Sequence, residues 1–137
     1  MNDAVELSEK QRFETLSDFR YRLRSFLRFS EDAAHRQGIT ALQYQLMLHT
    51  QGFAGREWAT VSELAERLQA KLHGVVALVT RCEELGLVHR EASQHDRRTV
   101  EVHLTAKGRR VLLPLAVEHA DRLSELANAV RAASLGI

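Results

Sequence analysis

Two adjacent arginines, Arg97 and Arg98, follow Asp96 in a polar stretch that runs from Glu91 to Thr99. A guanidinium is permanently charged and offers several N–H donors, which suits it to phosphate groups and base edges. A carboxylate two residues away can accept these N–H groups and hold one guanidinium in a fixed plane. The stretch is too charged to pack inside a protein, so we expect it to project. Its two arginines would then fit a narrow, strongly negative DNA minor groove.

A second group of candidate residues lies in the helix predicted from Leu72 to Leu85. Its buried side is predicted by apolar residues at spacings of three and four, namely Val75, Leu78, Val79, Cys82 and Leu85. The opposite side and the residue before the helix are mostly small or hydrogen-bonding: Lys71, His73, Gly74, Val76, Ala77, Thr80, Arg81 and Glu84. A helix in the DNA major groove needs short side chains for close approach and a few polar ones for base edges. We therefore predict that this side reads DNA, and the DNA-binding residues predicted here are Lys71, His73, Gly74, Val76, Ala77, Thr80 and Arg81.

A shorter helix is predicted just before this one. Thr60 and Glu63 have the T-x-x-E spacing of a capping box, so the shorter helix should begin at about Val61. Gln69 to Lys71 then form a break of about three residues, which is the length of the turn in a helix-turn-helix. The two helices are therefore predicted to form that motif.

After Gly86 the apolar pattern changes from helical to alternating. Glycine ends the helix because it adopts the left-handed C-cap conformation at little cost. Leu87 to Arg90 predicts one strand and Val100 to Leu104 its partner, with Glu91 to Thr99 as the loop between them. We expect Trp58 to lie in a short strand that pairs with this hairpin. Two helices followed by a hairpin with a charged tip form a winged helix-turn-helix.

These segments also resemble a known family. The run ELAERL, then VVALVTRCEELGLVHR and then DRRTVEVHLTAKG resemble the winged-helix core of the MarR family of bacterial transcriptional regulators, over about fifty residues. The most specific part is the pattern D-R-R-x-x-x-x-x-L-T-x-x-G, from Asp96 to Gly108. The resemblance implies that Arg98 enters the minor groove, that Asp96 orients it and that Arg97 contacts the DNA backbone. It also implies that the exposed side of the second helix reads the major groove.

Length and composition limit the class of protein. The chain of 137 residues has the length of one domain, and 45% hydrophobic and 27% charged residues fit a soluble globular protein. We find no apolar run of about 18 residues and no signal-peptide pattern, so we expect no membrane partner and a cytoplasmic location. The net charge is only +1. DNA binding would therefore depend on where charges lie rather than on their sum.

The N-terminal part predicts a long helix. Ser8 and Gln11 have capping-box spacing, and an apolar stripe then continues for about seven turns up to Gly38. The stripe consists of Phe13, Leu16, Phe19, Leu23, Phe26, Leu27, Ser30 and Ala33 or Ala34. Such a helix is longer than the core of a small winged-helix domain, so its apolar surface needs a second helix or a second subunit.

A further capping box, at Thr40 and Gln43, predicts the next helix from Ala41 to about Thr50. Its inward residues are predicted to be Leu42, Leu46 and either Met47 or Leu48.

The C-terminal part predicts another long helix. Thr105 is a suitable N-cap, and an apolar stripe runs from Arg109 to Ala133. Pro114 lies inside it, and we expect a kink or a break there, because proline lacks the N–H and clashes with the preceding turn. The stripe beyond Pro114 has no partner in the winged core.

The whole chain, 1–137, is thus predicted to be a single domain that is mainly α with a small β wing. Segments 8–37 and 109–135 would form a helical dimerisation layer, and segment 40–108 would form the DNA-binding lobe. Two lobes at a fixed separation bind half-sites about ten base pairs apart, so we expect a homodimer on an inverted repeat of double-stranded DNA.

The resemblance further implies a small anionic or aromatic effector that binds in a cleft between the lobes and changes DNA occupancy, as in a repressor. The residues expected near that cleft are Phe26, Ser30, His35, Tyr44 and His49. We predict no cofactor, no metal ligand and no catalytic residue.

Other classes of function stay open at this point. A metal-responsive regulator would use histidines, but the seven present form no H-x-x-x-H pair on a helix: His35, His49, His73, His89, His95, His103 and His119. A thiol switch would depend on Cys82 alone, which the helix pattern predicts to be buried and protonated.

Two further alternatives lie outside DNA-binding regulation. An enzyme is disfavoured because the sequence has no G-x-S-x-G motif and no phosphate-binding glycine loop. A protein-interaction module that keeps the fold without DNA affinity remains compatible with the modest charge and with Ala77. Many MarR members have a larger polar residue at that position, and most have Leu at the position of Cys82.

Overall fold

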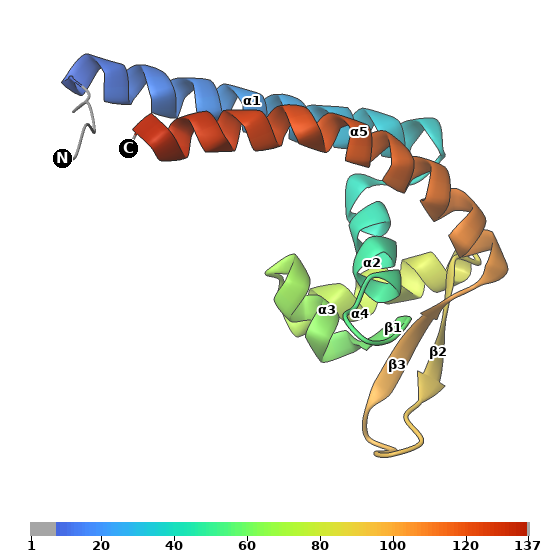
Figure 1. Cartoon of the computed structure of the whole chain (residues 1–137). Helices are drawn as coiled ribbons and strands as arrows, with labels where there is room; N and C mark the ends of the chain where they lie inside the picture. Colours follow the sequence, from blue (N-terminus) through green and yellow to red (C-terminus); the bar gives the residue numbers. More distant parts are fainter. Residues whose placement is uncertain (1–7, 137) are drawn as a thin grey trace. The chain divides into compact units, whose positions relative to one another are not determined.

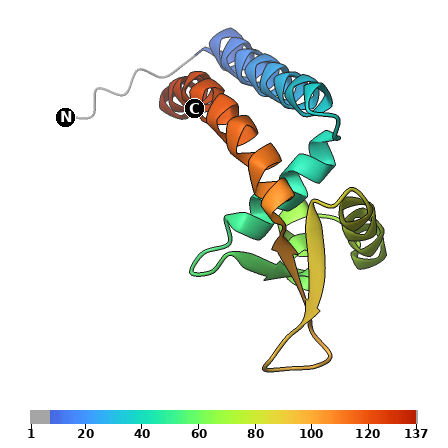
Figure 2. The same cartoon turned by 90° about the vertical axis from the view of Figure 1, so that its right-hand side faces the viewer.

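The computed structural model describes residues 8–136. The chain divides into two compact units: the first contains the residues up to Asp32 and those from Val117 on, and the second contains Ala33–Ala116. Figures 1 and 2 show the elements of both units. No helix within residues 8–136 is long and apolar enough to cross a membrane.

The first unit consists of most of α1, Glu9–Arg36, and the C-terminal part of α5, Ala106–Gly136. The predicted capping box is present, since the Ser8 amide donates to Gln11 Oε1 at 2.9 Å and the Gln11 amide donates to Ser8 Oγ at 3.2 Å. The two helices run antiparallel, side by side (Figure 1). A buried hydrogen bond of 2.8 Å joins Ser30 Oγ to His119 Nε2 between them.

Most of the predicted apolar stripe of α1 is not buried within this chain. Ser30, Ala33 and Ala34 are buried as expected, but several large apolar residues of the first unit are more than two-fifths exposed. They are Phe13, Leu16, Tyr21 and Leu27 on α1, and Val117, Leu123 and Val130 on α5. The single chain therefore leaves an apolar surface uncovered on this pair of helices.

The second unit begins with α2, Ala41–Gln51, whose capping box between Thr40 and Gln43 is confirmed. Its buried residues are Gln43, Tyr44, Leu46, Met47 and Thr50. The prediction that Leu42 faces inward is wrong, because its side chain is 54% exposed. Tyr44 and Thr50 lie on the buried side instead, and Thr50 satisfies its hydroxyl by donating to the Leu46 carbonyl at 2.7 Å.

The helix-turn-helix follows as predicted. α3, Val61–Leu68, starts with the Thr60 and Glu63 capping box, and α4, Leu72–Glu84, starts after a turn of three residues. Val75, Val79 and Cys82 form the buried stripe of α4. Leu85 was predicted to extend this stripe, but it is the C-cap and is 41% exposed. The chain turns at Gly86, which has a φ of +74°, so Leu87 is the next residue to enter the core.

Three antiparallel strands complete the winged lobe in the order β1-β3-β2. β1 is Trp58–Thr60, β2 is Val88–Ala92 and β3 is Val100–Leu104. The expected pairing of Trp58 with the hairpin is confirmed, opposite His103. The boundary predicted for β2 is wrong, because the strand starts one residue later and continues through Glu91, which the alternation had assigned to the loop. A charged side chain fits in a strand when it lies on the face away from the core.

β3 also differs from the predicted alternation. Glu101 is buried and Val100 is 37% exposed, the reverse of what apolar patterning indicates. Glu101 is satisfied by the imidazole of His103 at 3.0 Å, which allows a carboxylate at a buried position.

The start of α5 shows what Thr105 and Gly108, the last two fixed residues of the D-R-R pattern, do in the fold. Thr105 Oγ1 accepts the amide of Gly108 at 3.0 Å and donates to the Gly86 carbonyl at 2.6 Å, so Thr105 caps the helix as predicted. A Cβ on Gly108 would lie 2.1 Å from the Leu87 carbonyl oxygen, so only glycine allows this approach. The helix continues through Pro114, and a break there is not observed. Proline removes one hydrogen bond from a helix of 31 residues, and the remaining turns continue on both sides.

Candidate nucleic-acid interface

The predicted reading side of α4 is open to solvent. Lys71, His73, Gly74, Ala77 and Arg81 are exposed, Val76 is 43% exposed and Thr80 is half-buried. The opposite side of the helix packs into the winged lobe through Val75, Val79 and Cys82. One stripe of α4 is thus anchored while the other presents short side chains and a few donors outward.

Arg90 on β2 fixes the position of α4, and sequence reasoning did not single it out. Its Nη2 donates to Thr80 Oγ1 at 2.8 Å and to the Val76 carbonyl at 3.0 Å. Its Nη1 donates to Glu83 Oε1 at 2.8 Å, and its amide donates to the other oxygen of the same carboxylate. These bonds tie the wing to the candidate reading helix. Only the charge and its place in a predicted strand could have indicated Arg90 from sequence.

The same contacts restrict Thr80. Its hydroxyl donates to the Val76 carbonyl at 3.0 Å and accepts from Arg90. A base edge would therefore meet a hydroxyl whose hydrogen is already used within the helix. Thr80 can still accept a hydrogen bond through its second lone pair.

The wing loop presents its arginines freely. Arg98 has a side chain that is 95% exposed, and its Nε lies 3.8 Å from Asp96 Oδ1. The Arg98 amide donates to that same oxygen at 3.0 Å. Thr99 Oγ1 donates to the other oxygen of Asp96 at 3.4 Å, which makes the carboxylate part of the turn. Arg97 is exposed beside it.

Arg56, which was not predicted from the sequence, joins α3 to β1 and to the loop before it. Arg56 forms an ion pair with Glu63 and stacks on the rings of Phe53 and Trp58, at 4.1 and 4.0 Å from their centroids. Burial alone would raise the pKa of Glu63, but hydrogen bonds from Thr60 and Arg56 outweigh it and hold that pKa below its ordinary value. The capping carboxylate is therefore ionised at neutral pH.

The five residues predicted to line an effector cleft divide between the two compact units. Phe26 and Ser30 lie in the first, where the Phe26 ring is 6.0 Å from that of His119 and Ser30 is bonded to the same histidine. His35, Tyr44 and His49 belong to the second unit. Burial raises the pKa of Tyr44; burial, and then the charge of Arg67, lowers the pKa of His49.

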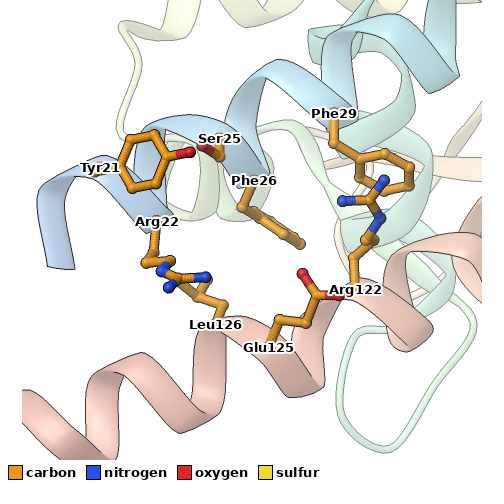
Figure 3. A pocket seen from close by; sticks show the side chains of 8 residues that line it. All are labelled: Tyr21, Arg22, Ser25, Phe26, Phe29, Arg122, Glu125 and Leu126. Atoms are coloured by element: carbon orange, nitrogen blue, oxygen red, sulfur yellow. The ribbon is translucent and has the colours of Figure 1, made fainter. Parts of the chain in front are cut away.

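A hollow of about 270 Å³ lies within the first unit, between α1 and α5. Figure 3 shows its lining residues: Tyr21, Arg22, Ser25, Phe26 and Phe29 from α1, and Arg122, Glu125 and Leu126 from α5. The Arg122 guanidinium lies 4.6 Å from the centroid of the Phe29 ring, and Arg22 Nε is 3.5 Å from Asp18. Phe26 is the one residue that this hollow shares with the predicted effector set.

Cys82 is fully buried, as its place on the helix stripe predicted. Burial raises the pKa of its thiol from 9.0 to about 11. The thiol is therefore protonated at neutral pH, which is the unreactive form.

Comparison with known proteins identifies the winged lobe. Residues 37–99 match the family model described as the MarR family. A stretch of 51 residues of the chain is 39% identical to an uncharacterised HTH-type transcriptional regulator, YfiV, of Bacillus subtilis (strain 168). That alignment covers 37% of this chain and 32% of the relative, so the chain matches about a third of the length of the relative.

Solved structures of MarR-type regulators share the fold. AbsC, a MarR family transcriptional regulator from Streptomyces coelicolor, superposes with a TM-score of 0.72 at 20% identity, over 88% of this chain and 80% of that one. A MepR variant from S. aureus, solved bound to an oligodeoxyribonucleotide, has a TM-score of 0.63 at 17% identity, over 90% and 84% of the two chains. At these identities the likeness shows the fold of the chain. The chain thus has the winged-helix fold seen in these structures of MarR-type regulators.

Proposed function

We propose that this chain is a transcriptional regulator that binds double-stranded DNA as a homodimer. One observation is the main support for this proposal. The outer side of α4 and the wing-tip residues Arg97 and Arg98 are exposed to solvent on the same lobe. A helix side with short side chains fits the major groove, and exposed guanidinium groups fit the minor groove. The MepR variant bound to an oligodeoxyribonucleotide supports a DNA partner for this fold.

Within this proposal, each predicted residue has a role. Arg98 enters the minor groove, Asp96 holds its guanidinium and Arg97 contacts phosphate. Seven residues would contact the major groove or its phosphates, namely Lys71, His73, Gly74, Val76, Ala77, Thr80 and Arg81. Thr80 would contribute as an acceptor only, because Val76 and Arg90 occupy the rest of its hydroxyl.

The dimer follows from the apolar surface of the first unit. The exposed apolar side chains on α1 and α5, such as Phe13, Leu27 and Leu123, are costly in water, at about 25 cal/mol per Å² of apolar area. A second copy of the same helix pair would cover them through an isologous contact. Two lobes on one duplex would multiply the affinity of a single lobe through effective concentration, and they require an inverted repeat.

We also propose a small anionic or aromatic effector. The hollow between α1 and α5 offers guanidiniums from Arg22 and Arg122 beside aromatic rings, which together suit an aromatic carboxylate. At about 270 Å³ it is near the lower limit of ligand pockets, roughly 300 Å³. Of the residues predicted to bind an effector, Phe26 lines this hollow. The roles of Ser30, His35, Tyr44 and His49 stay predictions.

The experiment that tests DNA binding is a salt titration of fluorescence anisotropy on a labelled random duplex. A DNA-binding chain loses affinity linearly in log–log form, with a slope of about −0.9 per phosphate contact. Arg98→Ala should weaken binding by about 1 to 3 kcal/mol and reduce the slope, because it removes one contact of each lobe. Arg131→Ala, an exposed arginine of α5, is the matched control and should change neither.

A flat salt response would favour the alternative of a protein-interaction module, and equal binding by the Arg98 variant and the wild type would contradict a wing that enters a groove. Selection of bound fragments from a random duplex pool would then give the operator and the spacing of its half-sites.

A further inference from the structure

Four titratable side chains gather on one face of the wing, outside the candidate DNA contacts. His89 and Glu91 alternate along β2, Glu101 and His103 alternate along β3, and the strand register pairs His89 with His103 and Glu91 with Glu101. Residues two apart on a strand lie on the same face, and paired residues lie opposite each other. All four side chains therefore point to the same side of the hairpin.

The arrangement brings together donor atoms that bind transition metals. His103 Nε2 lies 3.0 Å from Glu101 Oε1 and 3.3 Å from Glu91 Oε2. One ligand atom from each of these three residues lies within 4.8 Å of the others. Zn²⁺ holds nitrogen and oxygen ligands at about 2.0 to 2.2 Å, so neighbouring ligand atoms of a tetrahedral site are roughly 3.3 to 3.5 Å apart. The spacing observed around His103 is close to that value.

The two carboxylates of the cluster also favour a bound cation. Glu91 and Glu101 are directly opposite each other, and like charges in this position destabilise a sheet. Glu101 is buried, so solvent screens it poorly. A divalent ion between the two carboxylates would replace their repulsion by attraction to a shared centre.

The remaining neighbours match the surroundings of a metal site. His89 Nε2 is 2.9 Å from Glu91 Oε1, which orients that carboxylate from outside, and its hydrogen bond is the main reason that the pKa of Glu91 is lowered. Trp58 and His89 stack on the two faces of the His103 ring, at 6.0 and 5.3 Å between centroids. Glu91 is more than half exposed, so one side of the cluster is open to an entering ion and to water.

We propose that Glu91, Glu101 and His103 form a binding site for a divalent transition-metal ion of the Zn²⁺ class, with His89 as a positioning residue. Three protein ligands and one open position for water are a coordination that zinc commonly takes. The ion would join β2 to β3 one residue pair before the loop that carries Arg97 and Arg98. An effect of the ion on DNA affinity would depend on the proposed DNA-binding function. Binding of the metal ion does not depend on that function.

Sequence reasoning missed this cluster for a specific reason. The histidines were compared with the H-x-x-x-H spacing of helices, and β2 was predicted to end before Glu91. The relevant spacing is H-x-E on one strand and E-x-H on its partner, which becomes a single cluster only once the register is known.

The test is calorimetric titration of Zn²⁺ into the metal-free full-length chain, with Co²⁺ absorption as a second measurement. We expect one ion per chain and visible Co²⁺ bands of tetrahedral intensity. Glu101→Gln and Glu91→Gln should each weaken binding by more than about tenfold, and His89→Gln by about tenfold, as for an outer partner. His95→Gln, at an exposed histidine of the loop between β2 and β3, is the control and should bind as the wild type does.

Glu91 is exposed, so its variant should keep the fold even where the buried Glu101 does not, and far-UV circular dichroism checks both. Absence of a stoichiometric ion in the wild type, or equal affinity in the Glu91 variant, would overturn the site. Weak binding that His95→Gln reduces as much as Glu91→Gln would mean an adventitious ion only, and would overturn the site too.

Discussion

At the scale of residues, two arginines of the winged lobe differ in what occupies their N–H groups. Arg90 donates to Thr80, Val76 and Glu83, so its guanidinium belongs to the internal structure. Arg98 is almost fully exposed, and within residues 8–136 its ion-pair partner is the nearby carboxylate of Asp96. A surface ion pair of this kind contributes little, about 0 to 1 kcal/mol, so Arg98 can exchange it for a phosphate or a base edge. The position of each arginine in the fold therefore decides whether its N–H groups are used within the lobe or are open to a proposed DNA contact.

Cys82 supports a prediction at the same scale. Because burial raises its pKa to about 11, the folded chain should react with a disulfide reagent at pH 8 far more slowly than the chain unfolded in guanidinium. The folded state favours the neutral thiol, so this group contributes stability fully below pH 9.0 and loses it as the pH rises towards 11. Absorbance of the released thiolate follows the reaction, and equal rates in both states would contradict a buried thiol.

At the scale of elements, helix starts are the most strongly specified features of the chain. α2 and α3 begin with complete capping boxes, and Thr105 caps α5. Each cap satisfies amides that the first turn leaves without partners, and is worth about 1 kcal/mol. The start of α5 adds a close backbone approach at Gly108, which fixes how that helix leaves the sheet.

Two glycine substitutions test this approach, with opposite signs expected. Gly108→Ala should destabilise the chain by about 1 to 3 kcal/mol or more, because the new Cβ meets the Leu87 carbonyl oxygen at 2.1 Å. Gly74→Ala on α4 is the matched control, since its Cβ would meet nothing within 4 Å. It should stabilise by up to about 1 kcal/mol, from helix propensity. Urea unfolding measures both, and a stabilised Gly108 variant would refute the close contact.

At the scale of the whole molecule, the winged lobe closes its own core while the pair of long helices does not. Val75, Val79, Leu87 and Val102 are buried within the lobe. Phe13, Leu27 and Leu123 remain about half exposed or more on α1 and α5. An apolar surface of this extent is expected to be covered by another molecule, and a second copy of the chain is the partner that we propose.

Leu123→Asp tests the dimer, because a carboxylate in an apolar contact costs several kcal/mol unless it finds a partner. Light scattering should give a mass near 15.5 kDa for this variant and twice that for the wild type. Leu72→Asp is the matched control, since Leu72 is equally exposed, at 54% against 52%, but lies at the start of α4. It should keep the dimeric mass. A wild-type mass equal to that of one chain would contradict the two-fold layer.

The differences between sequence and structure have a common origin. Leu42 and Leu85 were placed inside by helical periodicity, but the neighbouring elements cover a different side of each helix. Glu91 was placed in the loop because of its charge, although a strand accepts a charge on its outer face. Pro114 was expected to kink or break α5, and no break is present, because the helix continues on both sides of it. For Leu42, Leu85 and Glu91, contacts with elements distant in sequence decided which side chains are covered.

The sequence by itself determined the order of the elements, their caps, the three-residue turn of the helix-turn-helix and the charged wing tip. These features depend on residues within about four positions of each other, so local spacing is enough to predict them. Only the tertiary structure decided that Arg90 holds α4 through Thr80 and Glu83, and that His89, Glu91, Glu101 and His103 form one cluster. Such contacts depend on strand register and on the packing of a strand against a helix, and no local pattern encodes either.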